Sequence, residues 1–333
     1  MSGEIVSFEP ATGEMLWRGA ISNVDDEITR ARGAWAEWAA KPLTFRTETL
    51  RRFADRVKAE GDKLAELIAR ETGKPLWEAR TEVESVANKV DISAKAYGER
   101  TPNRRIDASM GMRNALRHKP HGVLAVLGPY NFPAHLPNGH IVPALLAGNA
   151  VVFKPSEKTP ATGAMLVDLY HEAGVPQDVI RLVIGGPDEG KALAAHDGID
   201  GLLFTGSART GIALNRQFAS RPDKILALEL GGNNPIVVWD TTELTNAATL
   251  VVQSAFLSAG QRCTAGRRLI VHDTMADRLI DEVRGIANRL IVDQPLATPA
   301  PFMGPVIDNE AADGLTESFL VLMSNGGKVI KHM

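Results

Sequence analysis

The spacing of hydrophobic and polar positions changes near residue 122. Before it, apolar side chains recur every three or four residues, and one such set marks a helical face: Ile28, Ala31, Trp35 and Trp38. Further helices are predicted around residues 50–57 and 64–68, the latter ending at Gly73. Charged residues fill the opposite faces, which we interpret as solvated. The first hundred residues are therefore expected to be helical.

After residue 122 the apolar residues form short continuous runs with helical patterns between them. Six strands are predicted: Val123–Leu127, Ala150–Phe153, Val179–Ile184, Gly201–Phe204, Ile225–Leu228 and Pro235–Trp239. Strands that are apolar throughout and alternate with helices are typical of a parallel sheet covered on both faces. The pattern therefore predicts an α/β fold.

Two segments fall outside this alternation. Thr101–Pro120 is polar and basic, which predicts an exposed arm or hairpin. Ser324–Gly327 predicts a turn, and Lys328–Ile330 after it predicts the start of a strand. Because a strand needs a partner to pair with, we expect this chain to be C-terminally truncated.

Composition narrows the class of protein. The chain has 333 residues, of which 44% are hydrophobic, and its net charge is −3, so it is neither disordered nor basic enough for nucleic acid to be its main partner. Its longest apolar stretch, Ile141–Phe153, is interrupted by Pro143, Gly148 and Asn149, so no membrane helix is expected. The acidic N-terminus lacks the apolar segment of a signal peptide. A single cysteine excludes a disulfide framework and a multi-cysteine metal site. We expect a soluble, cytoplasmic protein.

Several common motifs are absent or incomplete. Gly206 and Gly211 have P-loop spacing, but Ile212 stands where a P-loop has lysine, and there is no G-x-S-x-G motif for a serine nucleophile. His135 and His140 are five residues apart, which does not suit metal ligands on one helical face, so we expect loop or packing residues. No metal site is predicted.

Three local features carry possible chemistry. Cys263 lies between glycines in a predicted turn. It is either a nucleophile or a buried small hydrophobic residue. Glu229 ends an apolar strand beside two glycines. It is either a base in a partly apolar pocket or a surface acid. Gly206 and Ser207 join a strand to a helix, where amides could bind phosphate or Ser207 could simply cap the helix.

Five segments, in this order and spacing, resemble motifs of the aldehyde dehydrogenase superfamily: Gly128–Pro133, Lys154–Glu157, Phe204–Ser207, Glu229–Gly232 and Gly260–Cys263. Within the superfamily, Tyr130–His140 and the Gly-Gln-Arg-Cys loop are most similar to the branch that oxidises a succinylated glutamate semialdehyde in arginine breakdown. The resemblance runs from about residue 3 to the last residue. It covers the chain but not the whole length of a family member.

The resemblance implies an aldehyde dehydrogenase-like α/β fold with two domains. Residues 1–228 would form a Rossmann-type, NAD-binding domain with a parallel sheet, interrupted by an oligomerisation arm at 101–120. Residues 229–333 would form the N-terminal part of a truncated catalytic domain. Full-length members would be homo-oligomers.

The resemblance also implies a covalent mechanism. Cys263 would attack the aldehyde to give a thiohemiacetal, whose oxyanion the Asn131 amide and the Cys263 backbone N–H would stabilise. Hydride transfer to the nicotinamide would leave a thioester, and Glu229 would activate the water that hydrolyses it.

The implied cofactor is NAD. Lys154 and Glu157 match the position of the adenosine ribose, where a carboxylate would repel the 2′-phosphate of NADP. The pyrophosphate position is matched by the end of a predicted strand and the start of the helix after it. These residues are Gly206, Ser207, Ala208, Arg209, Thr210 and Gly211.

The implied substrate, a small aldehyde, bears two carboxylates, so arginines should line its entrance. Arg262 and Arg267 are candidates from their closeness to Cys263, although they could equally pair with acids structurally. Two alternatives remain open. The chain could act on another semialdehyde, or it could be a catalytically impaired remnant that only binds a dinucleotide.

Overall fold

A five-stranded parallel sheet forms the centre of the computed structural model, which describes residues 3–107 and 109–331. The strand order is β7-β6-β5-β8-β9. Their bounds are β5 Val123–Leu127, β6 Ala150–Lys154, β7 Ile180–Leu182, β8 Gly201–Gly206 and β9 Ile225–Leu230. The chain adds β6 and β7 on one side of β5 and then returns to add β8 and β9 on the other. The direction of winding therefore reverses between β5 and β8, where α/β folds commonly bind ligands.

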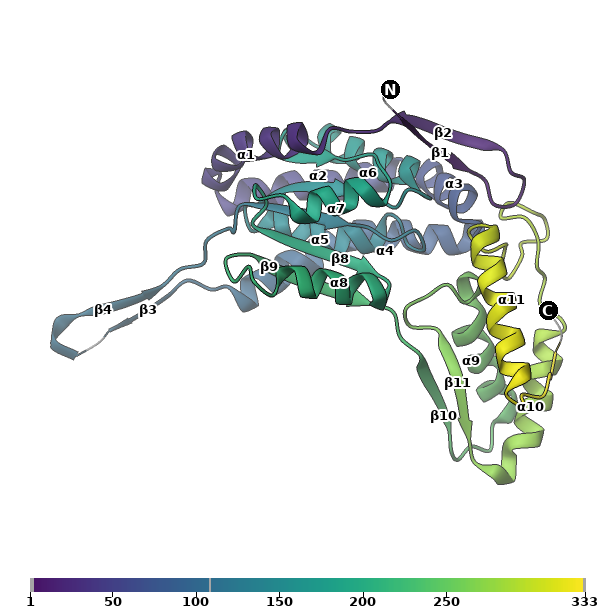
Figure 1. Cartoon of the computed structure of the whole chain (residues 1–333). Coiled ribbons are helices and arrows are strands. Elements are labelled where there is room, and N and C mark those ends of the chain that lie inside the picture. The colour runs from purple at the N-terminus through teal and green to yellow at the C-terminus, as the bar shows by residue number, and fades with distance from the viewer. Residues whose placement is uncertain (1–2, 108, 332–333) are drawn as a thin grey trace.

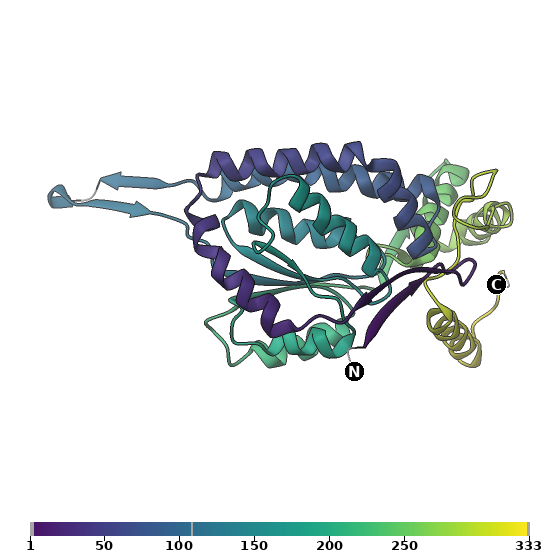
Figure 2. The ribbon, with the colours of Figure 1, turned by 90° about the horizontal axis from the view of Figure 1, so that it is seen from above.

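Helices cover both faces of this sheet (Figure 2). One face packs against α2 to α6, whose bounds are Leu43–Ala59, Gly61–Thr72, Leu76–Arg100, His135–Leu146 and Pro160–Glu172. The other packs against α1, α7 and α8, at Val24–Ala40, Pro187–Ala195 and Ala208–Phe218. Within β5, Val123 and Ala125 belong to one core and Leu124 and Val126 to the other. Both faces of the strand are buried, so the sequence is apolar throughout.

The N-terminal segment is not helical as expected, because a hairpin precedes the first helix. β1 (Glu4–Phe8) pairs antiparallel with β2 (Met15–Ala20). Gly13 supplies the left-handed turn with φ +74°, and Glu9 pairs with Arg70 of α3 at 3.0 Å. Strands this short contain too few alternating positions to stand out beside the long helical pattern that follows.

The exposed hairpin predicted within Thr101–Pro120 is present. β3 (Arg104–Asp107) pairs antiparallel with β4 (Arg113–Leu116), and all the residues of both strands are exposed. Figure 1 shows this arm projecting away from the rest of the molecule.

The segment after the sheet forms a second, smaller unit at the other end of the molecule from the arm (Figure 1). β10 (Asn234–Val238) and β11 (Gly266–Val271) form a separate parallel pair, so the sixth predicted strand does not join the five-stranded sheet. The helices here are α9 Leu244–Phe256, η2 Leu257–Gly260, α10 Asp273–Ala287 and α11 Asn309–Ser324. Lys328–Ile330 is not a strand, since its backbone has no ladder partner in the described chain.

Candidate active site

Four of the predicted site residues lie at the carboxyl edge of the central sheet. Asn131 is in the loop after β5, Lys154 ends β6, Gly206 ends β8, and Glu229 is the penultimate residue of β9. Because these strands are parallel, their carboxyl ends meet at one edge. This is the edge at which open α/β sheets bind ligands.

Cys263 reaches this edge from the second unit. It lies in an irregular turn between η2 and β11, and its side chain is an exposed free thiol. The Asn131 amide Nδ2 donates to the Gln261 carbonyl at 2.8 Å, and Asn234 Nδ2 donates to the Cys263 carbonyl at 2.7 Å. The loop after β5 and the cysteine turn are therefore in direct contact.

The Asn131 side chain is fixed by more than this one bond. Its Oδ1 accepts from the backbone N–H of Phe132 at 3.0 Å, and its own carbonyl accepts from Lys74 Nζ at 2.6 Å. An asparagine amide has two N–H donors, and the Gln261 carbonyl uses one of them. The other is the donor that could reach a substrate oxygen.

Glu229 is exposed, which agrees with the surface-acid interpretation and not with the partly apolar pocket. β9 is the last strand of the sheet, and among the residues that the structure describes it pairs with β8 alone, which leaves its outer edge without a strand partner there. In the register of these strands Glu229 is opposite Thr205, whose hydroxyl lies 3.0 Å from Nε2 of His140. Burial lowers the pKa of His140, while the charge of Glu229 opposes that effect.

The histidines lie on one helix, not in a loop. His135 begins α5 and His140 lies within it, and burial lowers the pKa of both. Each belongs to the packing around the loop after β5, as the packing interpretation allowed.

The strand–helix joint after β8 has the features of an anion site. Ser207 caps α8 by accepting from the Thr210 N–H at 3.2 Å, so the capping interpretation holds. Ser207 through Thr210 are all exposed, which leaves this helix N-terminus open to a ligand. At Gly211, a Cβ would lie 2.5 Å from Cδ2 of Leu230, so α8 approaches β9 this closely because position 211 has no side chain in the way of Leu230.

Lys154 and Glu157 lie together at the end of β6. Lys154 Nζ is buried and lies 3.8 Å from Oε2 of Glu157 and 3.1 Å from the Pro155 carbonyl. Burial lowers the pKa of Lys154, and the carboxylates of Glu157 and Glu189 oppose that shift. An ammonium donor beside a half-exposed carboxylate fits the hydroxyls of a ribose.

Comparison with known proteins decides the family. Residues 1–331 match the model of the aldehyde dehydrogenase family. The chain belongs to this family. The resemblance predicted from the motifs is thereby confirmed, and so is the predicted fold class, since solved family structures superpose on the chain as described next.

Individual relatives agree with this assignment. N-succinylglutamate 5-semialdehyde dehydrogenase of Sphingopyxis alaskensis is 79% identical over 100% of this chain and 69% of the relative. A point mutant of betaine aldehyde dehydrogenase from Staphylococcus aureus, in complex with NAD+, has a TM-score of 0.93 at 26% identity, covering 98% of this chain and 67% of that chain. An NADP-dependent glyceraldehyde-3-phosphate dehydrogenase from Bacillus halodurans, complexed with NADP, has a TM-score of 0.92 at 30% identity, covering 99% of this chain and 70% of that chain.

The two arginines near Cys263 differ in this aldehyde dehydrogenase. Arg262 Nη2 lies 2.6 Å from Oε1 of Glu78, a carboxylate whose side chain is completely buried. The structural pairing that was the alternative for Arg262 is therefore present. Arg267 is exposed, and its Nη2 donates to the Arg262 carbonyl at 3.3 Å.

Two acidic residues of α4 were missed from the sequence. Glu78 and Glu82 are buried, although charges on helices were interpreted as solvated. Glu78 contacts the segment before Cys263, and Glu82 contacts the loop that carries Asn131. An i, i+4 pair of glutamates on an otherwise mixed helix face was the only sequence signal for them.

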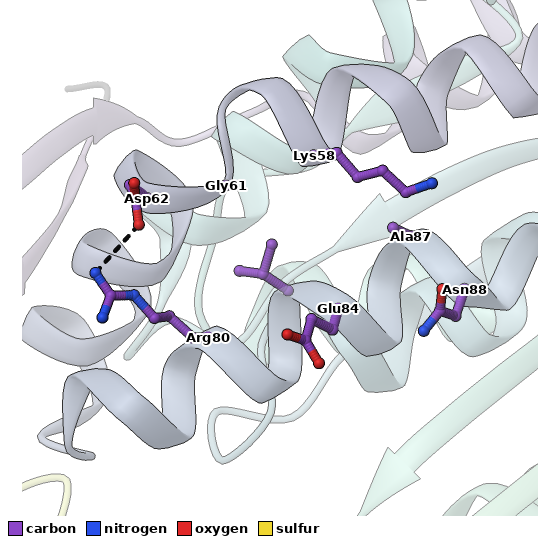
Figure 3. A pocket seen from close by; sticks show the side chains of 8 residues that line it. Lys58, Gly61, Asp62, Arg80, Glu84, Ala87 and Asn88 are labelled. Carbon is purple, nitrogen blue, oxygen red and sulfur yellow. Dashed lines mark hydrogen bonds and ion pairs between the residues drawn. The ribbon is translucent and has the colours of Figure 1, made fainter.

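A hollow of about 490 Å³ lies elsewhere in this family member, between α2, α3 and α4 (Figure 3). Its charged residues include Lys58, Asp62, Arg80 and Glu84, and Arg80 pairs with Asp62 at 3.2 Å. None of the predicted site residues lines it.

In the described residues, no helix is long and apolar enough to cross a membrane.

Proposed function

We propose that this chain oxidises N-succinylglutamate 5-semialdehyde to N-succinylglutamate with NAD. The contact between Asn131 and Gln261 carries the proposal, because it sets an oxyanion donor beside the turn of the only cysteine. The substrate is taken from the 79% identical relative, whose name specifies it. We propose that residues 1–228 form the NAD-binding domain and that residues 229–333 form the catalytic segment.

In the first step the Cys263 thiolate forms a C–S bond with the aldehyde carbon, and the carbonyl electron pair moves to oxygen. The free N–H of Asn131 and the backbone N–H of Cys263 stabilise this oxyanion. One such donor contributes about 2.7–4 kcal/mol to transition-state stabilisation. Bound NAD would supply the hydride acceptor that allows the tetrahedral adduct to become a thioester.

Glu229 acts in the second step. Its carboxylate takes a proton from water, the resulting hydroxide attacks the thioester carbon, and the C–S bond breaks to release the acid and the Cys263 thiolate. The exposure of Glu229 supports this role, since solvent reaches its side chain directly.

The residues at the carboxyl edge fit a dinucleotide. The exposed amides at the start of α8 would hold the pyrophosphate, and Lys154 with Glu157 would bind the ribose hydroxyls. Glu157 favours NAD, because its charge would repel a 2′-phosphate. No step of the chemistry requires a metal ion.

Arg267 is the proposed contact for a substrate carboxylate. It is exposed four residues after Cys263, and its hydrogen bond to the Arg262 carbonyl orients it toward the same loop. A guanidinium binds a carboxylate through two parallel N–H groups, which suits an acidic substrate. The arm at 101–120 is proposed to pair with other subunits in a homo-oligomer.

The test is NADH formation by the purified chain with NAD and N-succinylglutamate 5-semialdehyde, beside a Cys263→Ala control. Turnover that the control abolishes supports the dehydrogenase. A wild-type chain that binds NAD in calorimetry but forms no NADH would instead support the silent dinucleotide-binding alternative. Equal turnover of glutamate semialdehyde without the succinyl group would contradict the substrate assignment.

A further inference from the structure

Helix α4 carries two buried carboxylates one turn apart, on the side that faces the candidate active site. The Glu78 and Glu82 side chains are completely inaccessible to solvent. A buried carboxylate is strongly unfavourable unless cations and hydrogen-bond donors surround it. Each of these two accepts hydrogen bonds on both carboxylate oxygens, Glu82 from the loop after β5 and from Lys74, and Glu78 from the segment before Cys263.

Glu82 holds the loop that carries Asn131. Its Oε1 accepts from the backbone N–H groups of Ala134 and His135, both at 3.0 Å. Its Oε2 accepts from Lys74 Nζ at 2.7 Å, and the same ammonium donates to the Asn131 carbonyl at 2.6 Å. Glu82 therefore fixes both ends of the segment between Asn131 and the start of α5.

Glu78 holds the segment that leads to Cys263. Its Oε2 accepts from the Ser258 N–H at 3.1 Å, and its Oε1 accepts from the Ser258 hydroxyl and from Arg262 Nη2, the latter at 2.6 Å. Arg262 Nε also donates to Ser258 Oγ at 3.0 Å. The guanidinium thus makes two separate contacts, one to the carboxylate and one to the serine.

The backbone between these contacts has an unfavourable conformation. Ser258, Ala259 and Gly260 have φ values of 55°, 52° and 73°. Side chains with a Cβ rarely adopt this left-handed region, so Ser258 and Ala259 need support from their surroundings. Glu78 supplies it, because it binds the segment at Ser258 and, through Arg262, next to Cys263.

Phe132 connects the two halves of this arrangement. Lys74 Nζ lies 3.9 Å from the centre of its ring, and Arg262 Cζ lies 5.2 Å from the same centre. The cations that neutralise Glu82 and Glu78 therefore both contact the aromatic residue that follows Asn131.

We propose that Glu78 is a positioning residue that sets Cys263 against Asn131 through the two-point contact of Arg262. The inference rests on the proposed function for the roles of Asn131 and Cys263. It assigns Arg262, the residue before the nucleophile, to geometry and not to the binding of substrate carboxylates.

The test compares Glu78→Gln, Arg262→Gln and Arg262→Lys with Glu84→Gln, a control that removes an exposed charge from the same helix. Steady-state kinetics gives kcat and KM. The rate of alkylation of Cys263 by iodoacetamide, followed against pH, reports on the thiol without aldehyde turnover, and the only cysteine makes the label unambiguous. Thermal unfolding identifies any variant that fails to fold.

We expect Arg262→Gln and Arg262→Lys to lower kcat by about tenfold or more with KM for the aldehyde within about twofold, and to shift the alkylation profile. Glu78→Gln should do the same, and the double variant Glu78→Gln/Arg262→Gln should be no worse than either single variant. Glu84→Gln should match wild type. Lysine keeps the charge but not the two-point contact. An Arg262→Lys variant whose kcat and alkylation profile equal those of wild type therefore overturns the proposal. A raised KM with unchanged kcat in the Arg262 variants overturns it as well.

Failure of the proposed function gives a different result. A wild-type chain that turns over no aldehyde contradicts the function, while the alkylation profiles still test the positioning role. If folded Arg262 variants have the wild-type alkylation profile, Arg262 does not set the environment of Cys263 and the inference is wrong. If Glu78→Gln does not fold, the kcat values and alkylation profiles of the two Arg262 variants still decide whether the positioning role is right.

Discussion

Asn131 Nδ2 donates a 2.8 Å hydrogen bond to the backbone carbonyl of Gln261, two residues before Cys263. These residues are 130 positions apart in the chain and come from different structural units. The bond joins the loop after β5 to the cysteine turn directly. It uses one of the two N–H groups of the amide, and the other is the donor that we propose for an oxyanion formed at Cys263.

Replacing Asn131 should therefore affect chemistry more than folding. Asn131→Ala is expected to lower kcat by about 10²–10³-fold, the range seen when one oxyanion donor is removed. The KM for the aldehyde should change little, since the donor acts mainly in the transition state. Steady-state NADH formation measures both constants. Asn88→Ala, an exposed asparagine on α4, is the control, and equal loss in the two variants would point to a folding effect.

The two arginines beside Cys263 should separate in kinetics. Arg267→Ala is expected to raise the KM for N-succinylglutamate 5-semialdehyde by about tenfold, the loss of one charged contact, with kcat nearly unchanged. An uncharged aldehyde such as propanal should show no such difference between variant and wild type. Arg268→Ala is the control, because Arg268 is exposed and bonded to the Asn233 carbonyl at 2.9 Å. A KM that stays at the wild-type value removes Arg267 from the substrate site.

The pH dependence of stability should report on His140. Burial lowers its folded-state pKa below the ordinary 6.5, the nearby Lys89 adds to this, and Glu229 opposes it. The unfolded chain therefore binds the proton first as pH falls, so stability is retained above about 6.5 and lost progressively below it. His140→Gln keeps a hydrogen-bonding group for Thr205 but does not titrate. It should lose less stability than wild type between pH 7 and about 5.5.

Urea unfolding at the two pH values makes the comparison, with His118→Gln on the exposed arm as the control. His135 is also buried with a lowered pKa, so it keeps its own contribution in the His140 variant. Parallel pH profiles for wild type and His140→Gln would show that His140 contributes nothing to acid destabilisation.

Much of the fold could be predicted because the central strands are buried on both faces. A short apolar run that glycine or proline bounds on both sides, such as Val123–Leu127, favours a buried strand over a buried helix, and the observed β5 has the same bounds. The arm was predicted for the opposite reason, since the segment is polar and basic and continues neither the helical nor the strand pattern. The partners of Pro235–Trp239 were not predicted, because pairing with Gly266–Val271 depends on the position of the second unit.

The motifs identified the family, but sequence reasoning could not identify the groups that support them. Glu78 and Ser258 are 180 residues apart, and nothing in the spacing of either indicates the contact. A glutamate on a helix is usually solvated, so burial was the less probable interpretation of Glu78 and Glu82. For Glu229 the sequence left a partly apolar pocket and an exposed surface position both open, and its place on the last strand of the sheet agrees with the exposed one.

Gly211 should contribute to the close contact between α8 and β9. In Gly211→Ala the new Cβ would meet Leu230 Cδ2 at 2.5 Å, which should destabilise the fold by about 1–3 kcal/mol, as for other overpacked sites. It should also weaken NAD binding to the extent that α8, and not only the Leu230 side chain, moves to relieve the contact. Calorimetry and thermal unfolding measure the two effects. Leu230→Ala added to Gly211→Ala should restore part of both, whereas the open Gly33→Ala should be neutral or stabilising.

The choice between NAD and NADP should depend on Glu157. Its Oε2 lies 3.8 Å from Lys154 Nζ, the group that would otherwise attract a 2′-phosphate. Glu157→Gln removes the repelling charge, so we expect kcat/KM for NADP to rise relative to NAD by about tenfold, equivalent to about 1.4 kcal/mol. The measurement is the ratio of kcat/KM for the two cofactors, with Glu310→Gln as an exposed control. An unchanged ratio would mean that Glu157 does not contact the ribose, and the ribose position would then have to be assigned to other residues at the carboxyl edge.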